Sequence, residues 1–320
     1  MAYLNKVTYF KNFAMGTEID IAGTFIHHGI REFNRLKSFH YESEIFHVLY
    51  PISVGIERLQ KALIVLLEDI PLDQIELFEK SLITHSHQEL HVRILERCDI
   101  KFNSHQYRFL QVITNFYNTC RYDRFNISND YAKERDLLTD FLCTSLEIDI
   151  NISNLFPTYN DDRIKDFFGR VVGSISRKYY EQITEQSFKQ NIYTYELRSE
   201  SPASKIFLPE FKRDSLQEQY INEQISLKEF IVFLMNTKAT SDCYEFIKSI
   251  EPLNIEIAFV QEYLASICEG EVPQSLINEV EVLYEEDVED IKERINIINV
   301  IGNEHIIFGG MDEDEEVEDE

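Results

Sequence analysis

The chain has 320 residues, 44% of them hydrophobic, with only 10 Gly and 7 Pro, too few for the turns of an all-β protein. Its length favours two domains, or one domain with a large appendage. The formal net charge of −26 argues against a general nucleic-acid-binding surface, because affinity for phosphates comes chiefly from Lys and Arg. The five cysteines are scattered and form no CxxC pair, which argues against a disulfide framework or a thiolate zinc site.

The sequence shows no signal for secretion or for membrane insertion. MAYLNKVTYFKNF at the start lacks the apolar run of a signal peptide. The longest apolar run, Ala62 to Leu67, is far shorter than the roughly 20 residues that span a bilayer. We therefore expect a cytoplasmic, all-α protein.

Two helices are expected in the first 70 residues. Residues 18–36 carry apolar side chains at helical spacing, and residues 47–70 do so more strongly. The stretch Ala62 to Leu67 is apolar on every side, so other elements must cover it. The pattern predicts that residues 47–70 form the central helix of a bundle, with one face kept wet by Glu57, Arg58, Gln60 and Lys61.

Four more helices are expected up to residue 150. The spacing of apolar residues predicts helices at 73–82, 88–98, 104–125 and 131–150. Ser104 is the expected cap of the third of these. Together with the first two, these helices make up a predicted domain at residues 1–150.

The second half of the chain is also expected to be mostly helical. Polar residues and a proline at 151–162 indicate a domain boundary. Helices are predicted at 163–190, 214–236, 241–250, 254–268 and 274–299, whereas 193–211 could be a strand or an extended arm. Residues 151–300 form the predicted second domain, and 301–320 a disordered acidic tail, because Asp312 to Glu320 hold eight carboxylates.

The order FHVLYPISVGIERLQKALIVLLE, THSHQEL, HQYRFLQVITNFYNTCRYDRF resembles the HEPN superfamily of bacterial helical bundles. The resemblance covers the first half of the chain. It implies a bundle of four or five helices, frequent dimers, and a place in toxin–antitoxin, CRISPR or abortive-infection systems.

Active HEPN ribonucleases are expected to carry an Arg followed four to six residues later by His. Here the stretch after Arg121 contains Arg124 but no histidine in that window. Such a nuclease needs one group to remove the 2′-hydroxyl proton and a cation to stabilise the phosphorane. The chain therefore either lacks ribonuclease activity or uses His105 or His85 from nearby in space. The literal Arg-x4-His, Arg35 to His40, lies where the family does not place it.

Basic and aromatic residues of the 104–125 helix are candidates for binding. Arg108, Arg121 and Arg124, with Arg93, Arg97 and Lys101, could bind phosphate, or could neutralise carboxylates within the bundle or pair with a sister subunit. Phe116, Tyr117, Tyr122 and Phe125 could stack on bases. Aromatic residues at helical spacing are more often core residues, and we favour this interpretation over base stacking.

Histidines at 85, 87 and 91 are candidate metal ligands. His87 and His91 are four residues apart and could share a helix face. However, HQELH places Glu89 one position late for the HExxH motif, and spacing supplies no third ligand. The alternative, which we favour, is a capped helix start with histidines on a polar surface or at an interdomain contact.

We expect no cofactor, because neither GxxxxGK[ST] nor GxGxxG occurs. The leading hypothesis is an interaction or regulatory subunit of a bacterial anti-phage defence or toxin–antitoxin system, without autonomous catalysis. Its partner would be a protein with a basic surface, a homodimer is possible, and RNA is disfavoured by charge. The alternative is a metal-independent HEPN-type ribonuclease, an RNA endonuclease acting as a dimer, with Arg121, Arg124 and His105 as catalytic residues.

Overall fold

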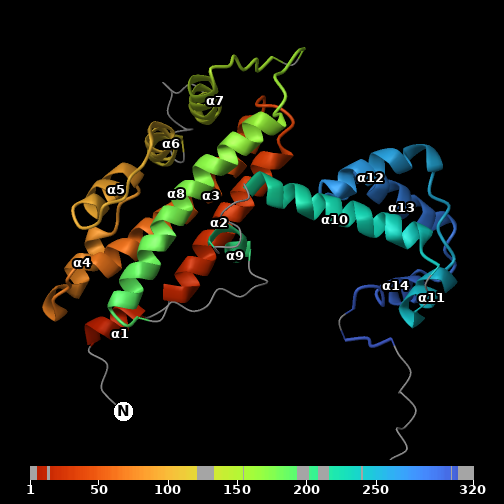
Figure 1. Cartoon of the computed structure of the whole chain (residues 1–320). Coiled ribbons are helices and arrows are strands. Elements are labelled where there is room, and N and C mark those ends of the chain that lie inside the picture. Colours follow the sequence, from red (N-terminus) through yellow and green to blue (C-terminus); the bar gives the residue numbers. More distant parts are fainter. Residues whose placement is uncertain are drawn as a thin grey trace, which may run out of the picture. The chain divides into compact units, whose positions relative to one another are not determined.

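The regular secondary structure of the chain is helical in the part that its computed structural model describes (Figure 1). Within these residues no strand forms, and one isolated β-bridge joins Ser38 and Tyr159. The all-α fold class predicted from the sequence is therefore confirmed. The chain divides into two compact units, Met1–Asn222 and Glu223–Glu320. The described residues are 6–12, 15–120, 133–153, 155–192, 202–207, 216–238, 241–303 and 305–308.

The first unit is built from α1 to α9, with the beginning of α10. Its helices are α1 (Lys6–Asn12), α2 (Met15–Arg35), α3 (Glu42–Leu67), α4 (Ile75–Ser81), α5 (His87–Leu95), α6 (Ser104–Asn115), α7 (Lys133–Leu146), α8 (Asp162–Lys189) and α9 (Pro202–Phe207). A 3₁₀ turn, η1 (Leu72–Gln74), precedes α4, and a π-helical turn, η2 (Phe116–Cys120), continues α6.

The second unit contains most of α10 and all later helices. These are α10 (Leu216–Asn236), α11 (Asp242–Ser249), the 3₁₀ turn η5 (Ile257–Phe259), α12 (Val260–Cys268), α13 (Gln274–Glu286) and α14 (Ile291–Ile298). Among all the described residues, no helix has both the length and the apolar character that crossing a lipid bilayer would need.

Helix α3 is the centre of the first unit, as its apolar pattern predicts. It packs against α2, α5, α7 and α8. The periodic residues Leu49, Ile52, Ile56, Leu59 and Leu63 are all fully buried. Burying each such side chain contributes about 1.5–3 kcal/mol, so the apolar stripe is what draws the other helices around α3.

Glycines allow α2 to approach its neighbours closely. A Cβ atom on Gly55 of α3 would lie 2.6 Å from Ile26 Cγ1 and 2.7 Å from the Ala22 carbonyl oxygen of α2. On the other side of α2, a Cβ on Gly23 would lie 2.4 Å from Ala203 Cβ of α9. Because any larger residue would collide there, these positions fix how closely α2 packs on both helices.

The helix at 162–189 belongs to the same core as α3. Phe168 of α8 stacks on Phe33 of α2 with ring centroids 3.8 Å apart, and it contacts Phe109 of α6 edge-on at 5.5 Å. The boundary expected at 151–162 thus differs from the division after Asn222. The polar residues at 151–162 form a turn between two helices of one core, and a turn signal alone does not distinguish that from a linker.

Three further expectations differ from the observed helices. Asn103, not Ser104, caps α6, and it does so through a reciprocal capping box with Gln106. The segment 193–211 includes a helix, α9, and its other residues lie outside the described ones. The single helix expected at 274–299 is two, α13 and α14, because Asp290 starts a new helix by accepting a hydrogen bond from the Glu293 amide.

Candidate functional site

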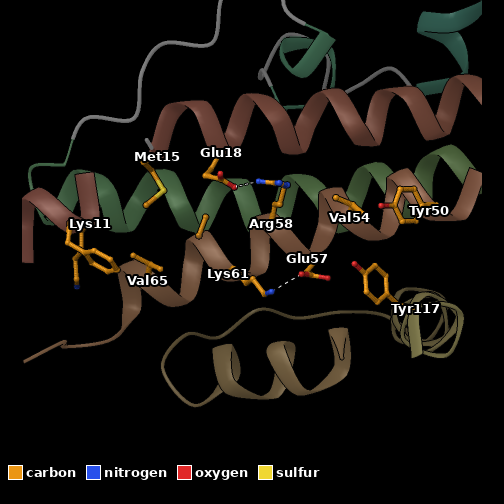
Figure 2. Close-up of a pocket in the computed structure, with 12 residues that line it drawn as sticks. Lys11, Met15, Glu18, Tyr50, Val54, Glu57, Arg58, Lys61, Val65 and Tyr117 are labelled. Atoms are coloured by element: carbon orange, nitrogen blue, oxygen red, sulfur yellow. Dashed lines mark hydrogen bonds and ion pairs between the residues drawn. The ribbon is translucent and has the colours of Figure 1, made fainter. Parts of the chain in front are cut away.

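A groove of about 560 Å³ runs along the side of α3 in the first unit (Figure 2). Its floor is a stripe of α3 that extends from Tyr50 to Val65. Met15 and Glu18 of α2 line one wall, and Tyr117 of η2 closes one end. The remaining lining residues are Phe10, Lys11, Val54, Glu57, Arg58, Lys61 and Ala62.

Glu57 is the centre of the charged part of this groove. Its side chain is only 11% exposed and accepts a hydrogen bond from Lys61 Nζ at 2.7 Å. His85, in the loop before α5, places Nδ1 3.1 Å from Glu57 Oε2. Because a carboxylate can only accept, the Nδ1–H of His85 donates, and Nε2 is left as the basic nitrogen.

An aromatic ring covers this cluster. The rings of Tyr117 and His85 lie 4.5 Å apart, and Figure 2 shows the Tyr117 hydroxyl pointing toward Glu57. Tyr117 belongs to the π-helical turn η2, a local geometry that often occurs at functional sites. Here the Glu57 carboxylate orients the His85 imidazole, and the Lys61 ammonium group also contacts Glu57. An imidazole held in this way can act as a general base, and the ammonium group can stabilise an anion.

The other charged side chains of the groove also form hydrogen bonds. Arg58 Nη1 donates to Glu18 of α2 across the groove, and both side chains are more than a third exposed. At the opposite end Lys11 is buried, and its Nζ donates to the carbonyls of Leu66 and Glu68. Burial lowers the pKa of Lys11.

A buried polar network lies behind the groove and joins α3, α5 and α8. Gln60 Nε2 donates to the His87 carbonyl and to the Tyr179 hydroxyl, both at 2.9 Å. Gln60 Oε1 accepts from His87 Nδ1 at 3.0 Å, and the Tyr179 hydroxyl donates to His91 Nδ1 at 2.8 Å. Gln60 was expected on the solvent-exposed face of α3, but its side chain is fully buried. Burial is tolerated because this network provides hydrogen-bond partners for its amide group.

The two histidines of this network are buried. This differs from the sequence analysis, which favoured a polar surface or an interdomain contact for them. His87 is 0% exposed and His91 2%. Burial lowers the pKa of His87 to about 3 and that of His91 to about 4. The Nε2 atom of each ring is buried and has no hydrogen-bond partner. Both imidazoles are therefore neutral at pH 7.

The candidate metal ligands His87 and His91 do not have the surroundings of a metal site. Nδ1 of His87 and Nδ1 of His91 already bond to Gln60 and Tyr179. His85, the third histidine of the sequence group, instead faces Glu57. In the described part of the chain no group of three His, Cys, Asp or Glu side chains could hold a metal ion. The cap expected for this helix is present, because Ser86 accepts from the Glu89 amide.

The basic residues predicted to bind phosphate differ in exposure and in partners among the described residues. Arg108, Arg97 and Lys101 are exposed, and Lys101 pairs with Asp99. Arg93 bonds through Nε and Nη2 to both carboxylate oxygens of Glu68. For Arg93 the alternative, neutralising a carboxylate within the bundle, is therefore confirmed.

The remaining predicted catalytic and stacking residues are only partly placed. Arg121, Arg124, Tyr122 and Phe125 lie outside the described residues. His105 packs edge-on against Phe167 with its Nδ1 buried and without a partner, and it does not line the groove. Phe116 and Tyr117 are buried, 0% and 6% exposed, which confirms them as core aromatic residues.

A second cavity, of about 630 Å³, lies within the second unit and is strongly acidic. Five of its lining residues are carboxylates, and Arg294 is the one basic residue among them. Apolar contacts come from Leu253, Val288 and Ile297. The acidic lining residues are Glu251, Asp287, Glu289, Asp290 and Glu293.

Charge is divided unequally between the two units. Residues 223–320 hold 26 of the 57 acidic residues and 5 of the 31 basic ones, so they carry −21 of the net charge of −26. Residues 1–222 carry only −5. Of the acidic tail expected at 301–320, residues 309–320 lie outside the described residues.

Sequence reasoning missed the arrangement around Glu57. His85 was singled out, but its partner lies 28 residues earlier in the chain, a separation that no local motif spans. The i, i+4 spacing of Glu57 and Lys61 was the available signal. Comparisons of the chain with protein-family models, with curated proteins and with solved structures found no significant match.

Proposed function

We propose that this chain is an interaction subunit of a bacterial anti-phage defence or toxin–antitoxin system, without catalysis of its own. In this proposal its second unit binds a protein partner that presents a basic surface. The bacterial setting rests on the resemblance of residues 46–125 to HEPN domains. The binding function rests on the acidic cavity, which is the single observation that carries the proposal.

The acidic cavity has the chemistry of a site for basic side chains. Its lining holds five carboxylates and one arginine, so its field attracts cations. The apolar lining residues Leu253, Val288 and Ile297 would contact the aliphatic part of a Lys or Arg side chain. Charge complementarity of this kind speeds encounter and selects against acidic partners.

The second unit also exposes much of its apolar surface. Tyr263, 6% exposed, is its one buried side chain among the described residues, and its hydroxyl bonds to Glu279 of α13. By contrast Phe230, Phe233 and Met235 of α10 are 56%, 54% and 78% exposed. Exposed apolar side chains are typical of interaction surfaces. Because the unit offers both apolar side chains and an acidic cavity, the partner we propose is an amphipathic helix with a basic face.

Binding of a defined peptide tests this proposal. The probe is a fluorescent helical peptide with Leu on one face and Lys on the other, titrated with the full chain at physiological salt. Replacing Glu251, Glu289 and Glu293 with Gln is expected to weaken binding about tenfold or more. The matched control replaces Glu76, Glu79 and Glu96, exposed in the first unit, and is expected to change binding less than about twofold.

Equal loss in both triple variants would mean that only the net charge matters, which would remove the proposed site. Binding of an otherwise identical peptide with Glu in place of Lys would also contradict the proposal. Proteins encoded beside this chain are the first natural partners to test in the same assay.

The ribonuclease alternative gains support from one observation, the contact of His85 with Glu57 and Tyr117. His85 has an oriented, partly exposed ring, whereas His105 packs against Phe167. If the alternative holds, His85 is the general base, and Arg121, four residues after Tyr117 in the sequence, supplies the cation.

Incubating the pure chain with transfer RNA under chelator separates the two functions. The interaction proposal expects no cleavage above the level of a buffer control. Cleavage that is lost on replacing His85 with Ala or Arg121 with Ala would contradict it and favour the enzyme. Replacing exposed His28 with Ala is the control for loss of a histidine as such.

A further inference from the structure

The acidic cavity of the second unit also holds one positive group, which the proposed function leaves unused. Arg294 of α14 is partly buried and lines the cavity together with the five carboxylates. Its Nε atom is buried and has no hydrogen-bond partner. Within the described part of the chain, no carboxylate forms an ion pair with its guanidinium. Arg294 therefore lies among carboxylates without pairing with them.

The carboxylates of the cavity are available in the same way. Glu251, Glu289 and Glu293 are exposed, and none of the five acidic lining residues forms an ion pair with another described residue. Asp290 accepts one hydrogen bond, from the Glu293 amide. Opposite charges that share a cavity without pairing can each bind a ligand group of the other sign, and such charge-assisted hydrogen bonds are the strong ones.

A ligand of only one sign would match the cavity poorly. A surface that offers only Lys or Arg side chains would satisfy the carboxylates but repel Arg294. It would also cover the guanidinium and leave its donors unpaired, which is costly. A purely acidic ligand would be repelled by the five carboxylates. The lining therefore favours a ligand in which a cation and an anion lie close together.

The C-terminal end of a helix carries both charges within one turn. Its last four carbonyl groups have no partner in the helix, and the macrodipole places about half a negative charge there. Lys and Arg are favoured in the same turn because they offset this dipole. Where the chain ends with the helix, the α-carboxylate adds a full negative charge. A guanidinium binds a carboxylate through two parallel hydrogen bonds.

The size of the cavity also fits the end of a helix. Its volume is about 630 Å³. One helical turn, about 11 Å wide and about 5.4 Å long, fills roughly 500 Å³. The cavity therefore admits a single turn, whereas the side of a longer helix would remain outside it.

We propose that the protein partner enters this cavity by the C-terminal end of its helix. The partner's α-carboxylate binds the guanidinium of Arg294, and a Lys or Arg side chain of its last turn lies among the five carboxylates. The opposite end of the helix is disfavoured, because its positive dipole would face Arg294. This inference rests on the proposed binding of a basic partner by the second unit, and it adds which end of the partner is recognised.

Two peptides that differ only at the C-terminus test the proposal. Both are the amphipathic Leu and Lys helix described above, with the fluorophore on the N-terminus and Lys as the last residue. One ends in a free carboxylate and the other in an amide. Titrated with the full chain at physiological salt, the acid is expected to bind about tenfold more tightly than the amide. Attraction by net charge predicts the opposite order, because the amide is more positive and the chain carries −26.

Arg294→Gln tests whether Arg294 is the group that binds the carboxylate. This variant is expected to bind the acid about tenfold more weakly than the wild type does, so that the preference for the acid disappears. It should bind the amide at least as tightly as the wild type does, because a repelling cation is gone. Retained binding of the amide also shows that the variant is folded.

The matched control is Lys292→Gln, which removes the same charge from the same helix. Lys292 is exposed and does not line the cavity. The preference of this variant for the acid is expected to remain within about twofold of the wild-type preference.

Equal affinity of the wild type for the two peptides would overturn the inference. A preference for the acid that persists in Arg294→Gln, or that is lost in Lys292→Gln, would do so as well. In each of these cases the basic peptide still binds, so the proposed function stands. If neither peptide binds, or if the Gln replacements of Glu251, Glu289 and Glu293 leave binding unchanged, the proposed function fails, and this inference fails with it.

Discussion

Gln60 and Tyr179 meet in the core of the first unit although 119 residues separate them in the chain. Gln60 Nε2 donates to the Tyr179 hydroxyl at 2.9 Å, and both side chains are fully buried. Burial raises the pKa of Tyr179, so the hydroxyl stays neutral and can both accept and donate. This hydroxyl is what connects the amide of α3 to His91 of α5.

Removing that hydroxyl is expected to destabilise the fold. Tyr179→Phe leaves Gln60 Nε2 with one acceptor fewer and His91 Nδ1 without its donor. A buried polar group left unpaired costs about 1–3 kcal/mol, so the free energy of unfolding in urea should fall by that amount. Tyr159→Phe, at an exposed hydroxyl, is the control and should change it by less than about 0.5 kcal/mol. Equal stability of Tyr179→Phe and wild type would show that the network does not stabilise the unit.

The same network predicts loss of stability in mild acid. The folded pKa of His87 is about 3 and that of His91 about 4, whereas an unfolded His titrates near 6.5. The unfolded chain therefore binds more protons below pH 6.5, and the contribution present above that pH is lost as the pH falls toward the folded values. At pH 5 the loss is about 2 kcal/mol for each histidine.

Urea unfolding measured between pH 7 and pH 5 checks this expectation. Replacing His91 with Phe, which removes one titrating group among aromatic neighbours, should reduce the pH dependence even if it lowers stability at pH 7. Replacing the exposed His28 with Gln, the control for loss of a histidine as such, should change the pH dependence less than replacing His91. His27 also has a pKa lowered to about 4, chiefly by burial, so it contributes in the same direction. A free energy of unfolding that stays constant from pH 7 to pH 5 would contradict the buried, neutral state of both histidines.

How far the sequence predicts this molecule depends on the distance over which each signal acts. The apolar periodicity of α3 is local and predicted both the helix and its central place. The contact of Glu57 with His85, 28 residues apart, and that of Gln60 with Tyr179 depend on how helices pack. No pattern within one helix contains that information. The polar residues at 151–162 indicated a domain boundary because the local sequence does not tell whether the helices on either side pack together. The exposure of Leu155 and Phe156 likewise depends on tertiary packing and could not be predicted.

Arg93 should be sensitive even to replacement by Lys. Its guanidinium bonds to both oxygens of Glu68 at 2.6 and 2.8 Å, and to the Ser81 carbonyl and hydroxyl. It also lies 5.5 Å from the centre of the Phe78 ring. Arg93→Lys keeps the charge but loses the planar fork, and after allowance for partial exposure we expect a loss of about 1 kcal/mol. Arg97→Lys, an exposed neighbour, is the control and should leave the melting temperature unchanged.

The close packing of α2 on α3 gives the last prediction, Gly55→Ala. In an exposed helix this change stabilises by about 1 kcal/mol, because Ala is the better helix former. Here the new methyl group would lie 2.7 Å from the Ala22 carbonyl oxygen, a backbone atom that cannot rotate away. Overpacking of this kind costs about 1–3 kcal/mol, so the clash outweighs the propensity and the melting temperature should fall. The melting temperature of the Gly55→Val variant should be lower still, since Val adds two more methyl groups to the same contact. A rise in melting temperature for Gly55→Ala would mean that α2 and α3 are not held as closely as the structure has them.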